Sequence, residues 1–500
     1  MRFLAHLLLT FAVACGGDAG DDPDADPSPP DAGARDATPP DAGARDPSPA
    51  DAGATDAGDA GAVDRGGPEA TYIKSPSPGV DDELGGGLAA HGDRVAVGAP
   101  GESSDARGVG GDADNDRRSQ SGAVFTYRAQ PDWTLEAYVK APNPSVDDRF
   151  GAAVALQGDL LAVGAELEDS SEGGVDPRLA DDDTSDSGAV YLYRFDGASW
   201  SLEAALKAPV PARNERFGAA VSVFGDRVAV GTPGEDASGG AVHLYARTDG
   251  AWMHEATLTS TPTEPNAFGN EVDLEADTLA VASLSEPPLL GGAVYVFERH
   301  GSTWVPQVRL TDNVPFDGLG SSLSVEGDRL LAGQPLESSG GRGVNAPLTG
   351  SRPASGAARL YARDPRGNWS LELAFKAENA EDNDLFGTHC ALREPWIACG
   401  AIQEDAVGPD PEDNSGDGVG AVYVYRRGAN GWVFVRYLKP ELSPAAGNYG
   451  LRVALSELGL FVSHRGDQSA SSGVGANPLD ASLSQAGAVY FFPYADLERE

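Results

Sequence analysis

The sequence predicts an all-β protein, a seven-bladed β-propeller with four antiparallel strands per blade. The first observation is a unit that recurs seven times, and the second is a last unit that lacks one strand, whose counterpart stands at the start of the array. Each unit opens with an aromatic residue or leucine followed by glycine, at Leu84-Gly85, Phe150-Gly151, Phe217-Gly218, Phe268-Gly269, Leu319-Gly320, Phe386-Gly387 and Tyr449-Gly450. A Gly-Ala pair later opens an aromatic-rich run, at Gly122-Ala123, Gly188-Ala189, Gly240-Ala241, Gly292-Ala293, Gly356-Ala357, Gly420-Ala421 and Gly487-Ala488.

Four strands are expected in each unit, and in the second copy they fall at 150–156, 160–165, 189–194 and 202–208. The first and third strands alternate apolar and polar residues and the second is almost continuously apolar, as in strands packed between neighbouring sheets. Two residues join the first two strands, and the Gly-Asp pair found in copies one, two, three and five suits a type II′ hairpin. Copies four, six and seven have Ala276-Asp277, Glu394-Pro395 and Glu457-Leu458 instead, and need another or a strained turn geometry.

The seventh unit ends at Tyr494, after its third strand. Residues 69–74 (EATYIK) match residues 135–140 (LEAYVK), which form the fourth strand of the first unit. An N-terminal strand that completes the last blade would close the ring and remove its exposed edges. The predicted propeller therefore spans 69–494 and is followed by a C-terminal tail at 495–500.

A tryptophan stands just before the fourth strand in six units. These residues are Trp133, Trp200, Trp252, Trp304, Trp369 and Trp432. Because the tryptophan recurs in the same slot, packing between blades is favoured over sugar binding.

The N-terminal segment predicts export and anchoring. Residues 1–14 combine Arg2, an apolar stretch too short to span a membrane and small residues before Cys15, which indicates a signal peptide and lipidation of Cys15. Ala12 stands where a bacterial lipobox usually has leucine, so ordinary signal cleavage and secretion are the alternative. Residues 15–68 have too little apolar bulk to fold and predict a disordered Asp/Ala/Pro/Gly stalk. The expected location is the bacterial cell envelope, at the outer membrane or cell surface.

A formal net charge of −41 disfavours nucleic acid as a partner, because proteins that bind phosphate backbones gather lysine and arginine on one face. Cations, basic proteins and neutral glycans are easier partners. The lipid anchor is the only membrane contact expected. The simplest alternative is that the charge keeps an exported protein in solution.

Cys390 and Cys399 predict a disulfide inside the sixth unit. Counted outward from the turn, they face each other across the hairpin at a non-hydrogen-bonded pair, where side chains are closest. The second copy has Val154 and Val163 in these slots, which are core positions. One disulfide suits an oxidising compartment.

Two sets of acidic residues are candidates for sites. Asp112, Asp114 and Asp116 alternate along one loop and could converge on Ca²⁺, but no sharp-turn glycine or downstream glutamate completes a recognised calcium loop, so a solvated loop is favoured. An acid also stands eighteen positions after the start of every unit: Glu102, Glu168, Glu235, Glu286, Glu337, Glu404 and Asp467. A structural ring, in which each acid accepts backbone N–H groups of a neighbouring loop, is favoured over a ring that gathers cations.

The recurring Phe-Gly starts, the run Val97-Gly98-Ala99-Pro100 after strand two and the Gly-Ala-Val-Tyr runs of strand three resemble the FG-GAP repeats of integrin α-subunit propellers. The chain looks most similar to the bacterial exported branch of that family. The resemblance implies a propeller fold and is weak for function, since propellers host binding modules, lyases and hydrolases. The family's calcium loop between the first two strands has no counterpart, because only two residues join them here.

The sequence indicates where a partner would bind. Loops between strands two and three, and between strands four and one, should share one face, and the first kind is long in copies one, two, five, six and seven. No nucleophile elbow, P-loop or zinc signature is present, so catalysis is not the favoured activity. We expect a binding or adhesion module that holds a protein or glycan. The alternatives are a glycan-active lyase or hydrolase with acids at the channel mouth, and an architectural subunit of an envelope complex.

Overall fold

The computed structural model describes residues 70–234, 239–260, 266–286, 289–312, 314–440 and 447–499. All of them belong to one compact unit that spans 67–500. The predicted signal peptide, Cys15 and the predicted stalk lie outside the described residues. Their expected roles stay predictions.

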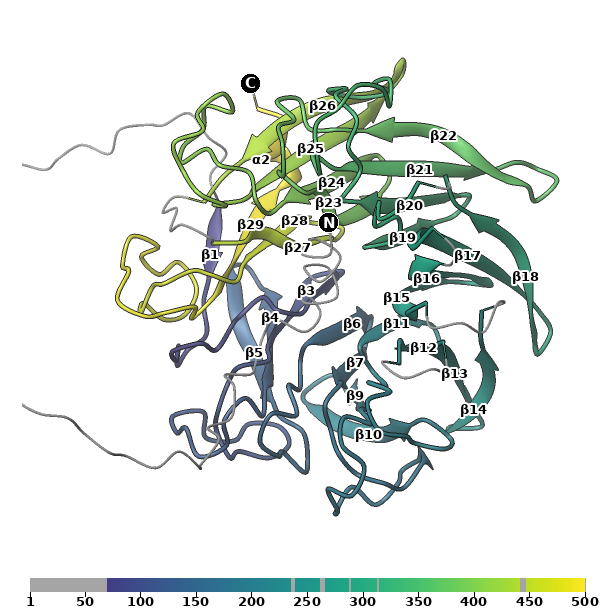
Figure 1. Ribbon diagram of the computed structural model, residues 1–500. Coiled ribbons are helices and arrows are strands. Elements are labelled where there is room, and N and C mark those ends of the chain that lie inside the picture. Colours follow the sequence, from purple (N-terminus) through teal and green to yellow (C-terminus); the bar gives the residue numbers. More distant parts are fainter. Residues whose placement is uncertain are drawn as a thin grey trace, which may run out of the picture. The chain divides into compact units, whose positions relative to one another are not determined.

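The predicted seven-bladed β-propeller is confirmed, with seven sheets that each contain four antiparallel strands in radial order (Figure 1). Blade 1 contains β2 (Leu88–His91), β3 (Arg94–Ala99), β4 (Ala123–Ala129) and β5 (Trp133–Val139). Blade 2 contains β6 (Ala153–Gln157), β7 (Leu160–Ala165), β9 (Ala189–Phe195) and β10 (Trp200–Lys207), with the short β8 (Gly174–Val175) added at its edge. Blade 3 contains β11 (Ala220–Phe224), β12 (Arg227–Thr232), β13 (Ala241–Thr248) and β14 (Ala251–Leu258).

The remaining blades repeat this order. Blade 4 contains β15 (Phe268–Glu275), β16 (Thr278–Glu286), β17 (Gly291–His300) and β18 (Thr303–Leu310). Blade 5 contains β19 (Leu323–Glu326), β20 (Arg329–Gln334), β21 (Ala357–Arg363) and β22 (Trp369–Phe375). Blade 6 contains β23 (Phe386–Arg393), β24 (Trp396–Ala401), β25 (Ala421–Gly428) and β26 (Gly431–Leu438). Blade 7 contains β27 (Tyr449–Leu455), β28 (Gly459–His464), β29 (Ala488–Pro493) and β1 (Thr71–Ile73).

The predicted closure by the N-terminal strand is also confirmed. β1 pairs antiparallel with β29, with Thr71 opposite Phe491 and Ile73 opposite Val489. The first strand of each blade lies innermost and contacts its neighbours, including β2 against β27 across the closure. On the turn side, the backbone N–H of Gly92 in blade 1 donates to Glu457 of blade 7 at 2.6 Å. The ring is therefore closed at both its inner and outer strands.

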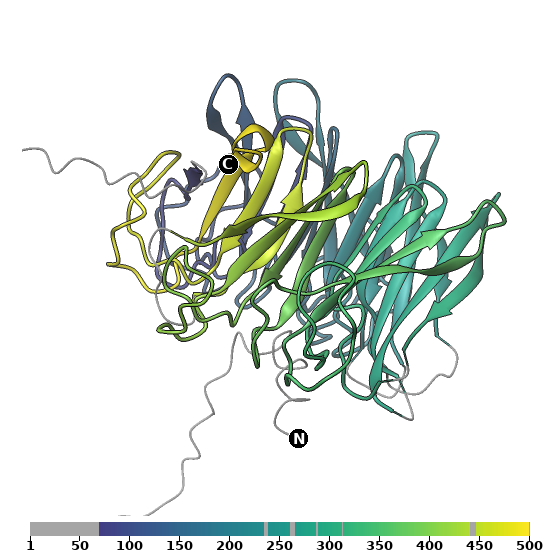
Figure 2. The ribbon, with the colours of Figure 1, turned by 90° about the horizontal axis from the view of Figure 1, so that it is seen from above.

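The two sides of the ring differ in their connections. Short hairpin turns join strands one to two and three to four on one side, and the longer two-to-three and four-to-one connections lie on the other (Figure 2). We call the second side the long-loop face. This arrangement follows from the alternating strand directions of each blade.

The turns between strands one and two show how the sequence departures are accommodated. Gly158 has φ 60° and Asp159 has no positive φ, which fits the predicted type II′ turn. Ala276 keeps the same left-handed backbone, with φ 53°, although a side chain disfavours it. The Glu394–Pro395 turn instead contains a cis peptide bond, and in blade 7 the N–H of Ser456 donates to the Gly459 carbonyl at 3.0 Å.

Apolar residues are buried between blades rather than within one blade. One cluster joins Ala96 and Val124 of blade 1 to Val163 and Trp200 of blade 2. The six tryptophans are between 3% and 8% exposed, and the ring of Trp133 lies edge-on to Phe461 of blade 7 at 5.2 Å. The tryptophan rings therefore pack between blades.

The predicted disulfide is confirmed. Cys390 and Cys399 are bonded, with their Cα atoms 4.2 Å apart, and they stand opposite each other on β23 and β24. Both are fully buried, as their valine counterparts predicted.

The C-terminal segment is more structured than expected. Residues 494–497 form a single helical turn, α2 (Tyr494–Leu497), whose Leu497 is fully buried and whose Tyr494 ring stacks on Trp396 at 4.9 Å. The segment is too short to show a helical period, so the sequence did not indicate it. No helix among the described residues is long and apolar enough to cross a membrane.

Deleting residues 70–74 should destabilise the propeller by at least ~5 kcal/mol, because it removes buried side chains and leaves β29 with a free edge. Denaturant unfolding followed by tryptophan fluorescence measures the effect. The control is a deletion of residues 60–64, which should leave the unfolding midpoint unchanged. An unchanged midpoint after the first deletion would show that the ring does not depend on β1.

Candidate functional site

Five of the seven acids that recur along the units lie at the base of the long loops, and each is paired with a buried lysine. We call each of these an acid–lysine pair. In blade 1, Lys140 Nζ lies 2.6 Å from Glu102 Oε2, and the two residues are 0% and 3% exposed. Lys140 also donates to Ser121 Oγ at 2.7 Å, and Tyr138 donates to Glu102 Oε1 at 2.8 Å.

The same arrangement recurs in four further blades. The pairs are Lys207–Glu168 at 2.6 Å, Lys376–Glu337 at 2.6 Å, Lys439–Glu404 at 2.6 Å and Lys74–Asp467 at 3.1 Å. Lys74 follows β1, so the closing strand brings the lysine of the seventh blade. These five residues are all the lysines in the chain.

The pair fastens both ends of a long loop to the fourth strand. In blade 2, Glu168 begins the loop, and Ser187, which accepts from Lys207 at 2.7 Å, ends it. Between them, Gly174 and Val175 form β8, which pairs with Lys207 and Leu206 of β10. Similar Gly-Val bridges tie the loops of blades 1, 5 and 7, at Val109↔Val139, Val344↔Phe375 and Val474↔Ile73.

Hydrogen bonds also connect each of two lysines to a tyrosine of the next blade. The hydroxyl of Tyr193 in blade 2 donates to the carbonyl of Lys140 in blade 1 at 2.7 Å, and Tyr127 of blade 1 donates to that of Lys74 at 2.7 Å. Burial lowers the pKa of Lys140, and its pairing with Glu102 opposes that shift. The lysines are therefore structural parts of the interface between blades.

Two acids of the predicted ring cannot be placed in an acid–lysine pair. Glu235 and the side chain of Glu286 lie outside what the structure describes. In their blades, 3 and 4, the lysine position is Thr259 and Thr311. These are the two blades with short two-to-three loops, so the lysine and the long loop occur together.

The predicted ring residues that are described do not face solvent as a cation-gathering surface would. Glu102, Glu168, Glu404 and Asp467 are at most 3% exposed. Backbone N–H groups do donate to them, as Ser104 does to Glu102 at 3.1 Å, but these come from the acid's own loop rather than a neighbouring one. The dominant partner is the lysine.

The candidate calcium residues lie in the long loop of blade 1. Asp112 accepts from the N–H of Asp114 at 3.0 Å, and Asp114 accepts from the hydroxyl of Ser77. Within the described residues, no group of three or more His, Cys, Asp or Glu side chains is placed to hold a metal ion. Calcium binding by Asp112, Asp114 and Asp116 stays a prediction.

Further buried carboxyls lie in the connections between blades. Asp82, Asp148 and Asp384 each accept a backbone N–H three residues earlier, at 2.6 to 2.7 Å. Burial raises the pKa of each to about 7. They order the four-to-one connections on the long-loop face.

The innermost strands of three blades carry an ionisable residue in the same position. Glu271, His389 and Arg452 occupy the same slot, three residues after the start of units four, six and seven, on innermost strands. Burial raises the pKa of Glu271 to about 7 and lowers that of His389 to about 3, and the positive charge of Arg452 lowers both. A carboxyl that titrates near neutral pH therefore stands on β15, an innermost strand.

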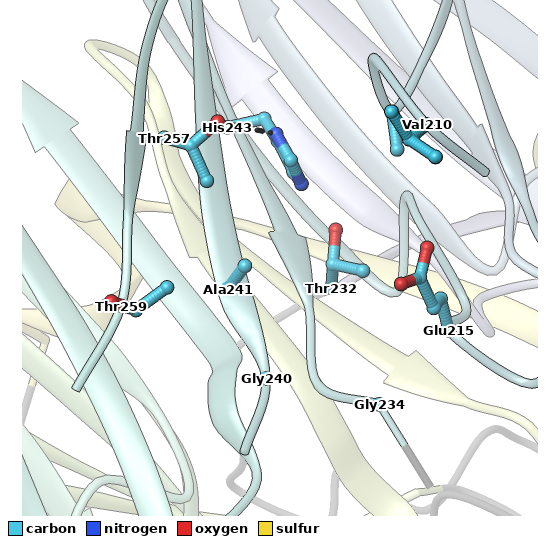
Figure 3. A pocket seen from close by; sticks show the side chains of 10 residues that line it. Val210, Glu215, Thr232, Gly234, Gly240, Ala241, His243, Thr257 and Thr259 are labelled. Atoms are coloured by element: carbon cyan, nitrogen blue, oxygen red, sulfur yellow. Dashed lines mark hydrogen bonds between the residues drawn. The ribbon is translucent and has the colours of Figure 1, made fainter. Parts of the chain in front are cut away.

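A cavity of about 220 Å³ lies where blade 3 meets the connection from blade 2 (Figure 3). Val210 and Glu215 line it from that connection, Thr232 and His243 from β12 and β13, and Thr259 after β14. His243 Nδ1 and Thr257 Oγ1 are 3.1 Å apart, and the other ring nitrogen of His243 turns toward the cavity (Figure 3). Burial lowers the pKa of His243 to about 4, so the ring is neutral at neutral pH.

Sequence reasoning placed the acids but missed the lysines and the Gly-Val segments. Both carry signals in the sequence: a lysine ends or directly follows the fourth strand in five units, and Gly-Val recurs in four long loops. A pair separated by almost forty residues is not visible as local periodicity. The cavity could not be predicted, because it depends on which side chains fill a space between blades.

One family model agrees with this architecture. The family model of the FG-GAP repeat matches residues 133–193 and 200–245. A crystal structure of a protein from Lactobacillus plantarum aligns with TM-score 0.47 and 14% identity over 80% of this chain and 99% of that chain, a level of similarity that carries no functional argument. No curated relative matches the sequence.

The propeller fold and its FG-GAP repeats support a generic binding or scaffold module. More particularly, the matched repeats and the seven blades fit an FG-GAP repeat protein that resembles the integrin α-subunit propeller.

The five lysines should resist an amine-specific acylating reagent in the native protein, because their side chains are at most 5% exposed. Peptide mass spectrometry should find them unmodified, and all five modified in the presence of denaturant. The N-terminal amine serves as the internal control. Rapid labelling of any of the five in the native protein would contradict the pairing.

Proposed function

We propose that the protein is an envelope-anchored binding or adhesion module that holds a protein or glycan on its long-loop face. The observation that carries this proposal is the set of long loops fastened at their bases by the acid–lysine pairs. Blades 5, 6, 7, 1 and 2 are consecutive around the ring, so these loops cover a continuous arc of that face. Loops that are fixed at both ends lose less conformational entropy on binding.

The location is part of the proposal. Export through residues 1–14 and lipidation of Cys15 would place the propeller at a bacterial envelope, with residues 15–68 as a spacer. The Cys390–Cys399 disulfide supports an oxidising compartment. The net charge of −41 favours basic or neutral partners over nucleic acid.

A glycan-active enzyme is the second candidate, and Glu271 favours it. A carboxyl with a pKa of about 7 can donate a proton near neutral pH, as a general acid must. Turnover of any glycan by the purified protein, lost in Glu271→Gln, would favour this candidate. We prefer binding because it explains why the long loops are fastened at their bases by the acid–lysine pairs. Catalysis by Glu271 would not require fixed loops.

Substituting acids on the long-loop face should weaken retention of the protein on isolated envelope material by at least ~tenfold, because a partner that binds there contacts these loops. Asp182→Asn/Asp183→Asn changes two exposed loop acids of blade 2, and Asp159→Asn/Asp226→Asn changes two exposed acids on the opposite side. Quantitative co-sedimentation compares the pairs, before and after protease treatment of the envelope material.

The control pair should bind as the unmodified protein does. Loss of retention after protease treatment would indicate a protein partner, and persistence would indicate a glycan. Equal effects of the two pairs would contradict use of the long-loop face. Co-purification in a fixed stoichiometry with envelope proteins, without retention on added envelope material, would favour the architectural alternative.

A further inference from the structure

The cavity in blade 3 occupies the place that a lysine network fills in other blades. In blade 2, Lys207 bonds to Glu168 at 2.6 Å, and Asn143 of the preceding connection donates to the same carboxylate at 3.3 Å. Tyr191 completes the network by donating to Asn143 Oδ1 at 2.7 Å. Lysine, tyrosine and asparagine side chains together fill the space between the connection and the blade.

Blade 6 repeats this network with the same residue types. Lys439 lies 2.6 Å from Glu404, Asn379 donates to Glu404 at 3.3 Å, and Tyr423 donates to Asn379 at 2.5 Å. The arrangement therefore has one common design in two blades. It provides an internal reference for what the space accommodates.

In blade 3 each of these positions carries a different, shorter side chain. Thr259 stands in the lysine position, His243 in the tyrosine position and Val210 in the asparagine position. Gly239 replaces Ser187, the hydroxyl that accepts from the lysine of blade 2. The cavity of about 220 Å³ is the space that these exchanges leave.

The residues that line the cavity suit a side chain like the missing lysine. Ala208, Val210 and Ala241 offer apolar wall for an alkyl stem. Thr232 is 3% exposed, and its hydroxyl has no hydrogen-bond partner among the described residues. A buried hydroxyl without a partner is unfavourable and gains from a ligand that bonds to it.

The charges at the cavity favour a cation. Glu215 lines it with a carboxylate, one oxygen of which accepts from the N–H of Ala212 at 3.0 Å. None of the described residues that line the cavity is a lysine or arginine, and the neutral ring of His243 adds no positive charge. The cavity is also smaller than the ~300–1,000 Å³ usual for whole drug-sized ligands, so a single side-chain-sized group fits it better.

We propose that this cavity binds a primary ammonium group carried on a short alkyl chain, which takes the place of the lysine that blade 3 lacks. The inference rests on the proposed function for its biological source, which would be a lysine side chain that a partner presents to the long-loop face. A free alkylamine shares the same chemistry. Glu215 and the Thr232 hydroxyl would accept from the ammonium group, and the apolar wall would cover the stem.

Titration calorimetry of the full-length protein with n-butylammonium tests the proposal. We expect saturable binding at millimolar concentration, and none for n-butanol or butyrate, which match the stem but lack the ammonium group. Thr259→Lys should weaken binding by at least tenfold, because the introduced lysine occupies the cavity itself. Thr311→Lys adds the same charge in blade 4, where Tyr295 keeps the aromatic position, and should leave binding unchanged.

Folding of each variant is checked by circular dichroism, and His243→Tyr serves as a second blocking variant if Thr259→Lys does not fold. Nα-acetyl-lysine methylamide and a lysine-containing peptide, compared with free n-butylammonium, distinguish a protein source from a free amine. Absence of butylammonium binding to the unmodified protein would overturn the proposal, as would equal binding by the blocking variants and Thr311→Lys.

Failure of this test is distinguishable from failure of the proposed function. If butylammonium does not bind but envelope retention depends on the long-loop acids, the binding module stands and the cavity is not its ligand site. If butylammonium binds but retention does not depend on that face, the cavity takes an amine without serving a partner there.

Discussion

The buried acid–lysine pair is the constraint on which the loop architecture depends. A charge moved from water into a protein interior costs several kcal/mol unless a partner compensates it. Lys207 is fully buried, and Glu168 is its ionic partner at 2.6 Å. Because neither can leave water without the other, the start of the long loop is fixed to the end of the fourth strand.

This constraint explains why the blades are unequal. Blades with the pair carry long loops, and the two blades with threonine in the lysine position do not. The ring therefore has a continuous arc of long, fixed loops, and blades 3 and 4 have only short two-to-three loops. The cavity lies at the border between them, where neither the connection from blade 2 nor blade 3 carries the side chains that fill this space in blades 2 and 6.

Much of the fold could be predicted because the same unit occurs seven times in the sequence. The Phe-Gly starts, the hairpin glycines and the match between residues 69–74 and 135–140 indicated the blades and their closure. The facing positions of Cys390 and Cys399, counted outward from their turn, indicated the disulfide. The partner of Glu102 was missed because Lys140 directly follows a different strand, β5, and only packing brings the two side chains together. The cavity was missed for a related reason: exchanges such as Lys207 to Thr259 look neutral in a sequence, and their effect depends on whether other side chains fill the space.

The most direct measurement of the central claim is a double-mutant cycle on the pair in blade 2, with Lys207→Met, Glu168→Gln and both together, read by denaturant unfolding. Each single substitution should cost ~3–5 kcal/mol, because it leaves a buried charge without its partner. The double variant should be much less unstable than the sum of the two. If the two effects add to within ~0.5 kcal/mol, the residues do not depend on each other and the account of the clamped loops is wrong.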